Sequence, residues 1–180
     1  SFKKGSLCEF KYSAYESLSK ILKDQFDLYG YMWDQSFFRW LLKLLRGTKS
    51  KYFSQLPSYY MGTVKDKSKI LSKYKFCLTI ENMSDVSFIT EKIFNAINAG
   101  CIPIYLGAPN ICDYIPKGCY INLREFGDWV KLSKFLNNFS ESDYINFLKN
   151  RKEFLQSNNY KEFSSRSFTK IITSEIYKEV

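Results

Sequence analysis

Residues 74–107 read YKFCLTIENMSDVSFITEKIFNAINAGCIPIYLG, and the fold is decided by this stretch. The apolar run 76–80 predicts a buried strand, and the run 102–106, closed by Gly107, predicts another. Between them, four residues recur at helical spacing and predict the buried face of a helix: Ile93, Ala96, Ile97 and Gly100. A strand, a helix and a strand within about thirty residues make a βαβ unit with a right-handed crossover.

The polar loop 81–90 joins the first strand to the helix, at the sheet edge where open α/β folds bind ligands. Ser87 or Thr90 can cap the helix by accepting a hydrogen bond from a free backbone N–H group. Glu91 and Lys92 then fall in the first turn. A helix N-terminus attracts anions, and a lysine there adds a full positive charge. The pattern fits an anion site, or an ordinary cap with two solvated charges.

The same string closely resembles a known motif. The patterns YKF-x-L-x-x-EN and I-T-E-K-I-x-x-A-x-x-A-G-x-I-P-I-Y-x-G-A are similar to the donor-binding motif of the α1,3/1,4-fucosyltransferases, glycosyltransferase family 10. The resemblance continues through NICDYIPKGCYINLREF and is strongest over residues 62–126, above all to bacterial members. It implies that the chain is the Rossmann-like donor-binding domain of a GT-B enzyme, an α/β fold with a parallel sheet flanked by helices. It also implies transfer of fucose from GDP-fucose to a glycan hydroxyl, α1,3 or α1,4, with inversion.

The resemblance assigns donor contacts along the motif, and Phe88 departs from it because relatives often carry tyrosine there. In the family, a basic residue, usually arginine, begins an earlier helix and reaches the donor diphosphate. Counting back along the helical stripe 14–22 places Lys11 at that position, which supplies charge without the bidentate fork of arginine. The expected donor-binding residues are Lys11, Asn82, Phe88, Thr90, Glu91 and Lys92.

No catalytic base is assigned. The family's base is a carboxylate of an N-terminal acceptor domain, and that domain is expected to be absent from residues 1–180, which read as a single donor domain. No strand is evident before the first helix, so the chain is expected to start inside that domain. Glu81 is read as a structural or donor-shell carboxylate. The alternative function is a truncated sugar-nucleotide-binding module without transfer activity.

Composition bounds the remaining partners. The chain has 27 Lys and Arg against 18 Asp and Glu, and no histidine, so its formal net charge is +9. Its lysines are spread along the chain and no nucleic-acid-binding motif occurs, so no nucleic acid is expected. Neither Asp-x-Asp nor a histidine cluster occurs, so neither a metal nor another cofactor is expected. The expected partners are GDP-fucose and an oligosaccharide acceptor, such as that of a bacterial lipopolysaccharide.

Residues 36–46, SFFRWLLKLLR, form a basic amphipathic pattern. Such a helix can make peripheral contact with an anionic membrane, or it can pack on the sheet with a basic outer face, which is the favoured interpretation. No stretch approaches the roughly 18 apolar residues of a transmembrane span. The expected location is the cytoplasm, with peripheral contact at the inner membrane, or the Golgi lumen if the source is eukaryotic.

The other elements follow from periodicity and from turn residues. Residues 119–123 predict a short strand, and Cys112 and Cys119 could pair, although five scattered cysteines favour free thiols. Three further helices are expected from apolar residues in helical phase, around residues 129–136, 142–154 and 168–176.

Overall fold

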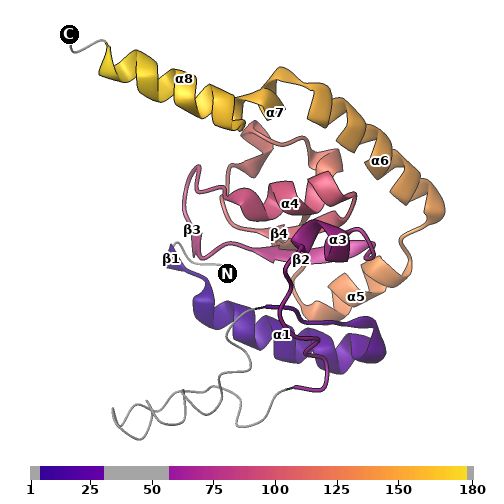
Figure 1. Cartoon of the computed structure of the whole chain (residues 1–180). Coiled ribbons are helices and arrows are strands. Elements are labelled where there is room, and N and C mark those ends of the chain that lie inside the picture. The colour runs from indigo at the N-terminus through magenta and orange to yellow at the C-terminus, as the bar shows by residue number, and fades with distance from the viewer. Residues whose placement is uncertain (1–4, 31–56, 178–180) are drawn as a thin grey trace, which may run out of the picture.

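The computed structural model describes residues 5–30 and 57–177, and it confirms the predicted α/β class (Figure 1). The central βαβ unit consists of β2 (Phe76–Ile80), α4 (Glu91–Ala99) and β4 (Ile102–Leu106). A third strand, β5 (Ile121–Asn122), completes a sheet with the order β2-β4-β5, in which both pairings are parallel. The helix expected at residues 36–46 lies outside the described residues.

Strand β4 organises the core because every one of its residues is buried. Ile102, Ile104 and Leu106 alternate onto one face, where they pack in the cluster that holds Ala14 and Leu18. That face is covered by α1 (Cys8–Leu22) and α5 (Trp129–Asn137). Tyr105 points to the other face and packs with Ile93 and Ile97 of α4. Helices therefore lie on both faces of the sheet.

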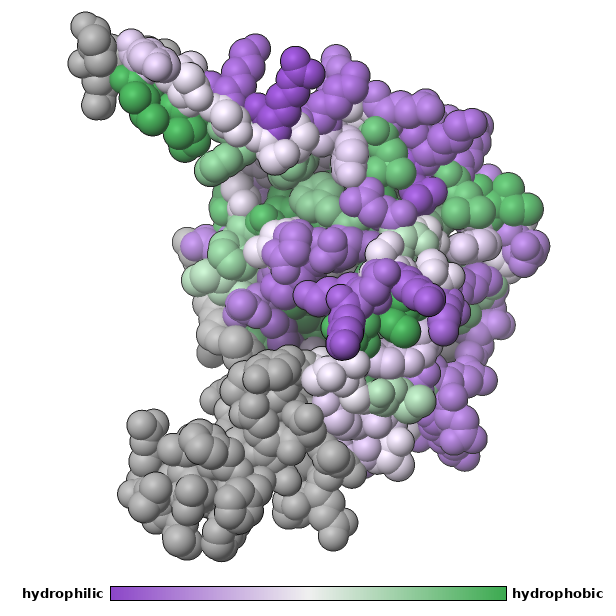
Figure 2. Space-filling model, in the orientation of Figure 1, coloured by the Kyte–Doolittle hydropathy of each residue, from purple (hydrophilic) through white to green (hydrophobic). Residues whose placement is uncertain are grey.

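The chain then continues through α6 (Glu141–Gln156), α7 (Asn158–Glu162) and α8 (Ser165–Ile176). Helix α8 confirms the predicted amphipathic pattern, yet its apolar residues are exposed, with 66% of Phe168 and 61% of Ile176 accessible to solvent. Figure 2 shows this hydrophobic surface along the projecting helix. Within the described residues, no helix is long and apolar enough to cross a membrane.

Several sequence predictions need correction. A strand does precede the first helix: β1 (Gly5–Ser6) pairs antiparallel with β3 (Met83–Ser84). Because α1 begins at Cys8, Lys11 is the fourth helical residue rather than the first. The strand expected over residues 119–123 is shorter, since 3₁₀ helices Lys117–Cys119 and Leu123–Glu125 flank it.

Two further findings concern local structure. The described part of the chain contains a short helix that the sequence analysis omits, α3 (Lys67–Leu71), which begins where Asp66 accepts a hydrogen bond from the Lys69 amide. The cysteine expectation is confirmed for the four cysteines that are described, all of which are free. Cys112 and Cys119 therefore do not pair.

Candidate functional site

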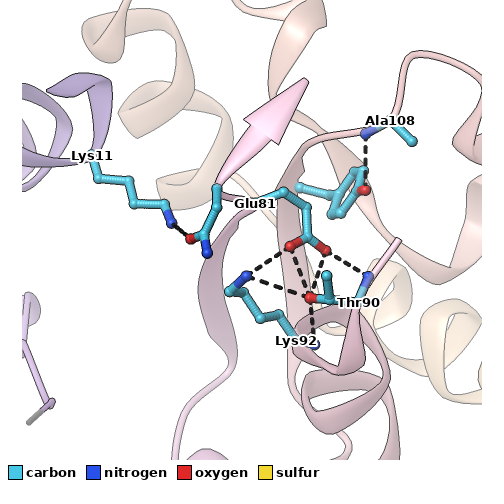
Figure 3. Close-up of polar contacts among 7 residues, drawn as sticks. Lys11, Glu81, Thr90, Lys92 and Ala108 are labelled. Atoms are coloured by element: carbon cyan, nitrogen blue, oxygen red, sulfur yellow. Dashed lines mark hydrogen bonds and ion pairs between the residues drawn. The ribbon is translucent and has the colours of Figure 1, made fainter. Parts of the chain in front are cut away.

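Glu81 is the first residue after β2, and its side chain is fully buried, with 0% exposed. Its carboxylate accepts hydrogen bonds from the Thr90 amide at 2.9 Å and from the Lys92 ammonium at 2.7 Å (Figure 3). The Thr90 hydroxyl lies 2.8 Å from the same carboxylate. A buried charge is tolerated only when it is paired and hydrogen-bonded, and Glu81 meets both conditions. One carboxylate thus fixes the start of α4.

Thr90, and not Ser87, is the residue that caps α4. It has an extended backbone, and its hydroxyl accepts a hydrogen bond from the Lys92 amide at 3.5 Å. Ser87 has a left-handed backbone with φ of 60°. Its amide donates to Asn110 Oδ1 at 2.9 Å, so Ser87 joins the loop to the turn after β4.

The predicted donor-binding lysine, Lys92, is held between this buried carboxylate and the surface. Its Nζ atom forms an ion pair with Glu81 Oε2 at 2.7 Å, while 32% of its side chain is exposed. The same ammonium group lies 3.4 Å from the Thr90 hydroxyl oxygen. Because an ammonium group has three N–H donors, these two contacts leave one donor for an anionic ligand. Glu91 beside it is exposed and Phe88 is half-buried.

Lys11 and Asn82 meet although they lie far apart in the sequence. Lys11 Nζ donates to Asn82 Oδ1 at 2.6 Å, and the Leu7 amide donates to the Asn82 carbonyl at 2.8 Å. Figure 3 shows the Lys11 contact next to the Glu81 cluster. The six predicted donor-binding residues belong to two segments, the start of α1 and residues 82–92, which run from the end of β2 into the first turn of α4. The two segments meet where Lys11 contacts Asn82.

The sequence analysis did not assign three further residues of this edge to the site. Gly107 follows β4 with no room for a side chain, because a Cβ atom there would lie 2.5 Å from Glu81 Cγ. The Tyr105 hydroxyl accepts a hydrogen bond from the Ala108 amide at 3.0 Å, and burial raises the pKa of this phenol. Arg124 follows β5 and donates to the Gly107 carbonyl at 2.8 Å. Their position in the sequence could have identified them, since each lies at or just after the end of a predicted parallel strand.

The charges of this edge favour an anionic ligand. Lys11, Lys92 and Arg124 contribute three cations, and the start of α4 adds the positive end of the helix dipole. Burial lowers the pKa of Arg124, but arginine stays charged in proteins. Within residues 5–30 and 57–177, no cluster of histidine, cysteine or acidic residues could hold a metal ion.

Comparison with known proteins gives related sequences over parts of the chain. A segment of 71 residues is 38% identical to an α-(1,4)-fucosyltransferase of Arabidopsis thaliana, and this segment covers 39% of this chain and 18% of that protein. A segment of 91 residues is 38% identical to the α-(1,3)-fucosyltransferase FucT of Helicobacter pylori, covering 49% and 17%. A GDP-fucose protein O-fucosyltransferase 3 of Danio rerio is 34% identical over 108 residues, covering 56% and 23%. Each match thus spans less than a quarter of the relative.

Solved structures of α1,3-fucosyltransferases are also similar to the chain. One matches 51% of this chain and 30% of its own, with 28% identity and a TM-score of 0.45. Another, solved with GDP-fucose, matches 76% and 44%, with 19% identity and a TM-score of 0.47.

A family model covers far more of the chain than any of these relatives' aligned segments. Residues 13–174 match the model described as glycosyltransferase family 10 (fucosyltransferase) C-term. This range includes all the predicted donor-binding residues except Lys11. The chain therefore belongs to glycosyltransferase family 10, the fucosyltransferases, and matches the C-terminal part of that family.

Proposed function

We propose that this chain forms the GDP-fucose site of a fucosyltransferase that transfers fucose to a glycan hydroxyl, α1,3 or α1,4, with inversion. The observation that carries the proposal is the position of Lys92. Buried Glu81 fixes Lys92 at the N-terminus of α4, where about one third of the Lys92 side chain is exposed. Lys92 therefore lies on the same sheet edge as the contact between Lys11 and Asn82. Family membership and the name of the zebrafish relative support GDP-fucose as the donor.

The chemistry of transfer makes use of this charge. Negative charge develops on the diphosphate as the bond to the anomeric carbon breaks, and fixed cations and amide dipoles stabilise that charge. Lys92, Lys11 and the amides at the start of α4 take this role. We propose that Asn82 and Glu91, which are both exposed, hold hydroxyl groups of ribose or fucose. These groups form the donor half of the reaction.

The acceptor half needs a base. Glu81 does not suit that role, because it is fully buried and both carboxylate oxygens accept hydrogen bonds. The proposed base is a carboxylate of the acceptor domain that the family resemblance implies. Because Glu81 does not suit the role of base, a second candidate function is that this chain alone binds the sugar nucleotide without transferring the sugar. Incubation with GDP-fucose and N-acetyllactosamine, with mass detection of the product, separates the two.

Donor binding by this chain is expected to depend on Lys11. Replacing Lys11 by methionine removes a charge-assisted contact at a partly exposed position, so GDP-fucose should bind about tenfold more weakly. Calorimetric titration measures this change. The matched control is Lys152→Met, an exposed position next to Arg151, which bonds the C-terminal end of α4 away from the site. Equal affinity of the wild type and Lys11→Met would exclude Lys11 from the donor site.

Donor binding is also expected to need no divalent metal, because lysine side chains and helix amides supply the positive charge at the diphosphate. Titrations of GDP-fucose with and without EDTA should superimpose. The opposite result, a loss of affinity in EDTA that Mn²⁺ or Mg²⁺ restores, would assign part of that charge to a metal ion.

A further inference from the structure

We propose that Arg124 is a positioning residue of the donor site, which fixes Asn82 by clamping β3 to the end of β4. The inference rests on the proposed function, because it concerns how the GDP-fucose site is held in shape. Arg124 is not among the residues that the family resemblance assigns to the donor. It lies just after the predicted third strand, in the 3₁₀ helix Leu123–Glu125.

Arg124 bonds two separate segments with one nitrogen. Its Nη2 atom donates to Ser84 Oγ of β3 at 2.6 Å and to the Gly107 carbonyl after β4 at 2.8 Å. Ser84 is buried, with 4% exposed, and its hydroxyl lies 3.2 Å from the same carbonyl. The Arg124 backbone is itself fixed, since its amide donates to Asn122 Oδ1 at 3.1 Å. Hydrogen bonds from a charged donor are about twice as strong as neutral ones.

The clamp reaches the donor site through β3. Ser84 pairs with Gly5 in the two-stranded sheet of β1 and β3. Asn82, two residues before Ser84, receives the Leu7 amide on its carbonyl and the Lys11 ammonium on its side chain. A two-residue strand pair is too small to hold its position alone. Buried Glu81 holds Asn82 on its N-terminal side, so the position of Asn82 on the other side depends on how firmly Ser84 is anchored.

Helix α1 has an anchor of its own, so the effect of Arg124 falls mainly on Asn82. Ala14 and Leu18 are 0% and 2% exposed and belong to the main core cluster. Loss of the clamp should leave α1 in place while β3 shifts. The Lys11–Asn82 contact would then lengthen from the Asn82 side.

The test compares GDP-fucose affinity in the whole chain and in variants at two arginines. Arg124→Ala should bind GDP-fucose about tenfold more weakly, and Arg124→Lys, which keeps the charge but lacks the planar guanidinium group, should have an intermediate affinity. Arg151→Ala is the matched control, because Arg151 also donates two hydrogen bonds to other segments, in its case to the carbonyls of Ile97 and Asn98 at the far end of α4. It should bind like the wild type. Circular dichroism checks the fold, and Ser84→Ala, which removes the clamp from its other side, substitutes if Arg124→Ala does not fold.

Amide hydrogen exchange tests the same clamp in the absence of GDP-fucose. The Leu7 amide, which donates to the Asn82 carbonyl, should exchange faster in Arg124→Ala, and the Ile97 amide in buried α4 should not change. Wild-type affinity in Arg124→Ala, or an equal loss in Arg151→Ala, would overturn the proposal, as would an unchanged Leu7 amide. If the wild-type chain itself binds no GDP-fucose, the proposed function fails and the donor-site role with it. The exchange result then still decides whether Arg124 fixes Asn82.

Discussion

Replacing Lys92 by methionine should destabilise the protein more than replacing Lys92 and Glu81 together. Lys92 is the cationic partner of a carboxylate with 0% exposure, at 2.7 Å. Removing one partner of a buried ion pair leaves an uncompensated charge and costs about 3–5 kcal/mol. Because 32% of the Lys92 side chain is exposed, we expect a loss of about 3 kcal/mol, at the lower end of that range.

In the double variant Glu81→Gln/Lys92→Met, the uncompensated charge is gone. The glutamine oxygen can still accept a hydrogen bond from Thr90, so the loss should fall to about 1 kcal/mol. Urea unfolding measures these free energies. The control is Lys131→Met, which breaks an exposed pair with Asp128 at 3.9 Å and should change stability by less than about 1 kcal/mol. A Lys92→Met variant as stable as the wild type would show that Glu81 does not need the lysine.

The same variants separate structural from ligand-binding roles of Lys92. Both the single and the double variant lose the ammonium group, so both should bind GDP-fucose roughly ten- to hundred-fold more weakly than the wild type. Recovery of affinity in the double variant would mean that Lys92 acts only by neutralising Glu81. Calorimetry under conditions where each variant is folded decides between these roles.

The sequence predicts the elements whose residues are fixed by burial. β4 has five buried residues in a row and α4 has a buried stripe, so apolar runs and helical spacing predict both of them. The one correction is Gly100, which does not lie on the buried face but ends α4 in a left-handed conformation, with φ of 81°. The two-residue strand β1 and the five-residue helix α3 are not predicted, because two residues show no alternation and five residues make little more than one helical turn. Helix α8 is predicted from its stripe, yet periodicity does not say what covers an apolar face, and Phe168 is 66% exposed.

The sequence predicts which residues form the site, but it does not predict which of them contact each other. The motif contains Glu81, Thr90 and Lys92, but sequence alone cannot show that Lys92 turns one donor to Glu81. Ser87 and Thr90 carry the same hydroxyl, and only the backbone angles and partners separate the cap from the loop contact. Arg124 lies 40 residues from Ser84, and no local pattern records that contact.

Adding a single methyl group at Gly107, by Gly107→Ala, should lower both the stability of the protein and its affinity for the donor. Gly107 ends β4 against two buried side chains, and an added Cβ atom would lie 2.5 Å from Glu81 Cγ and 2.6 Å from Tyr105 Cζ. Contacts this short do not occur, so a neighbour must shift. Glu81 and Tyr105 have 0% and 1% exposure, and both are hydrogen-bonded, so neither can turn toward solvent.

The expected result is a loss of about 2–3 kcal/mol, as in other overpacked cores, which lowers the melting temperature by about 5–10 °C. Donor affinity should fall more than tenfold, because displacement of Glu81 moves the partners of its carboxylate, Thr90 and Lys92. The control is Gly127→Ala, where the nearest atom to the new Cβ is Nζ of the exposed Lys131 side chain, at 3.8 Å. That variant should melt and bind like the wild type. If Gly107→Ala matched it in both measurements, the end of β4 would have room to move, and the rigid junction of Glu81, Tyr105 and Gly107 could not be what holds Lys92 in place.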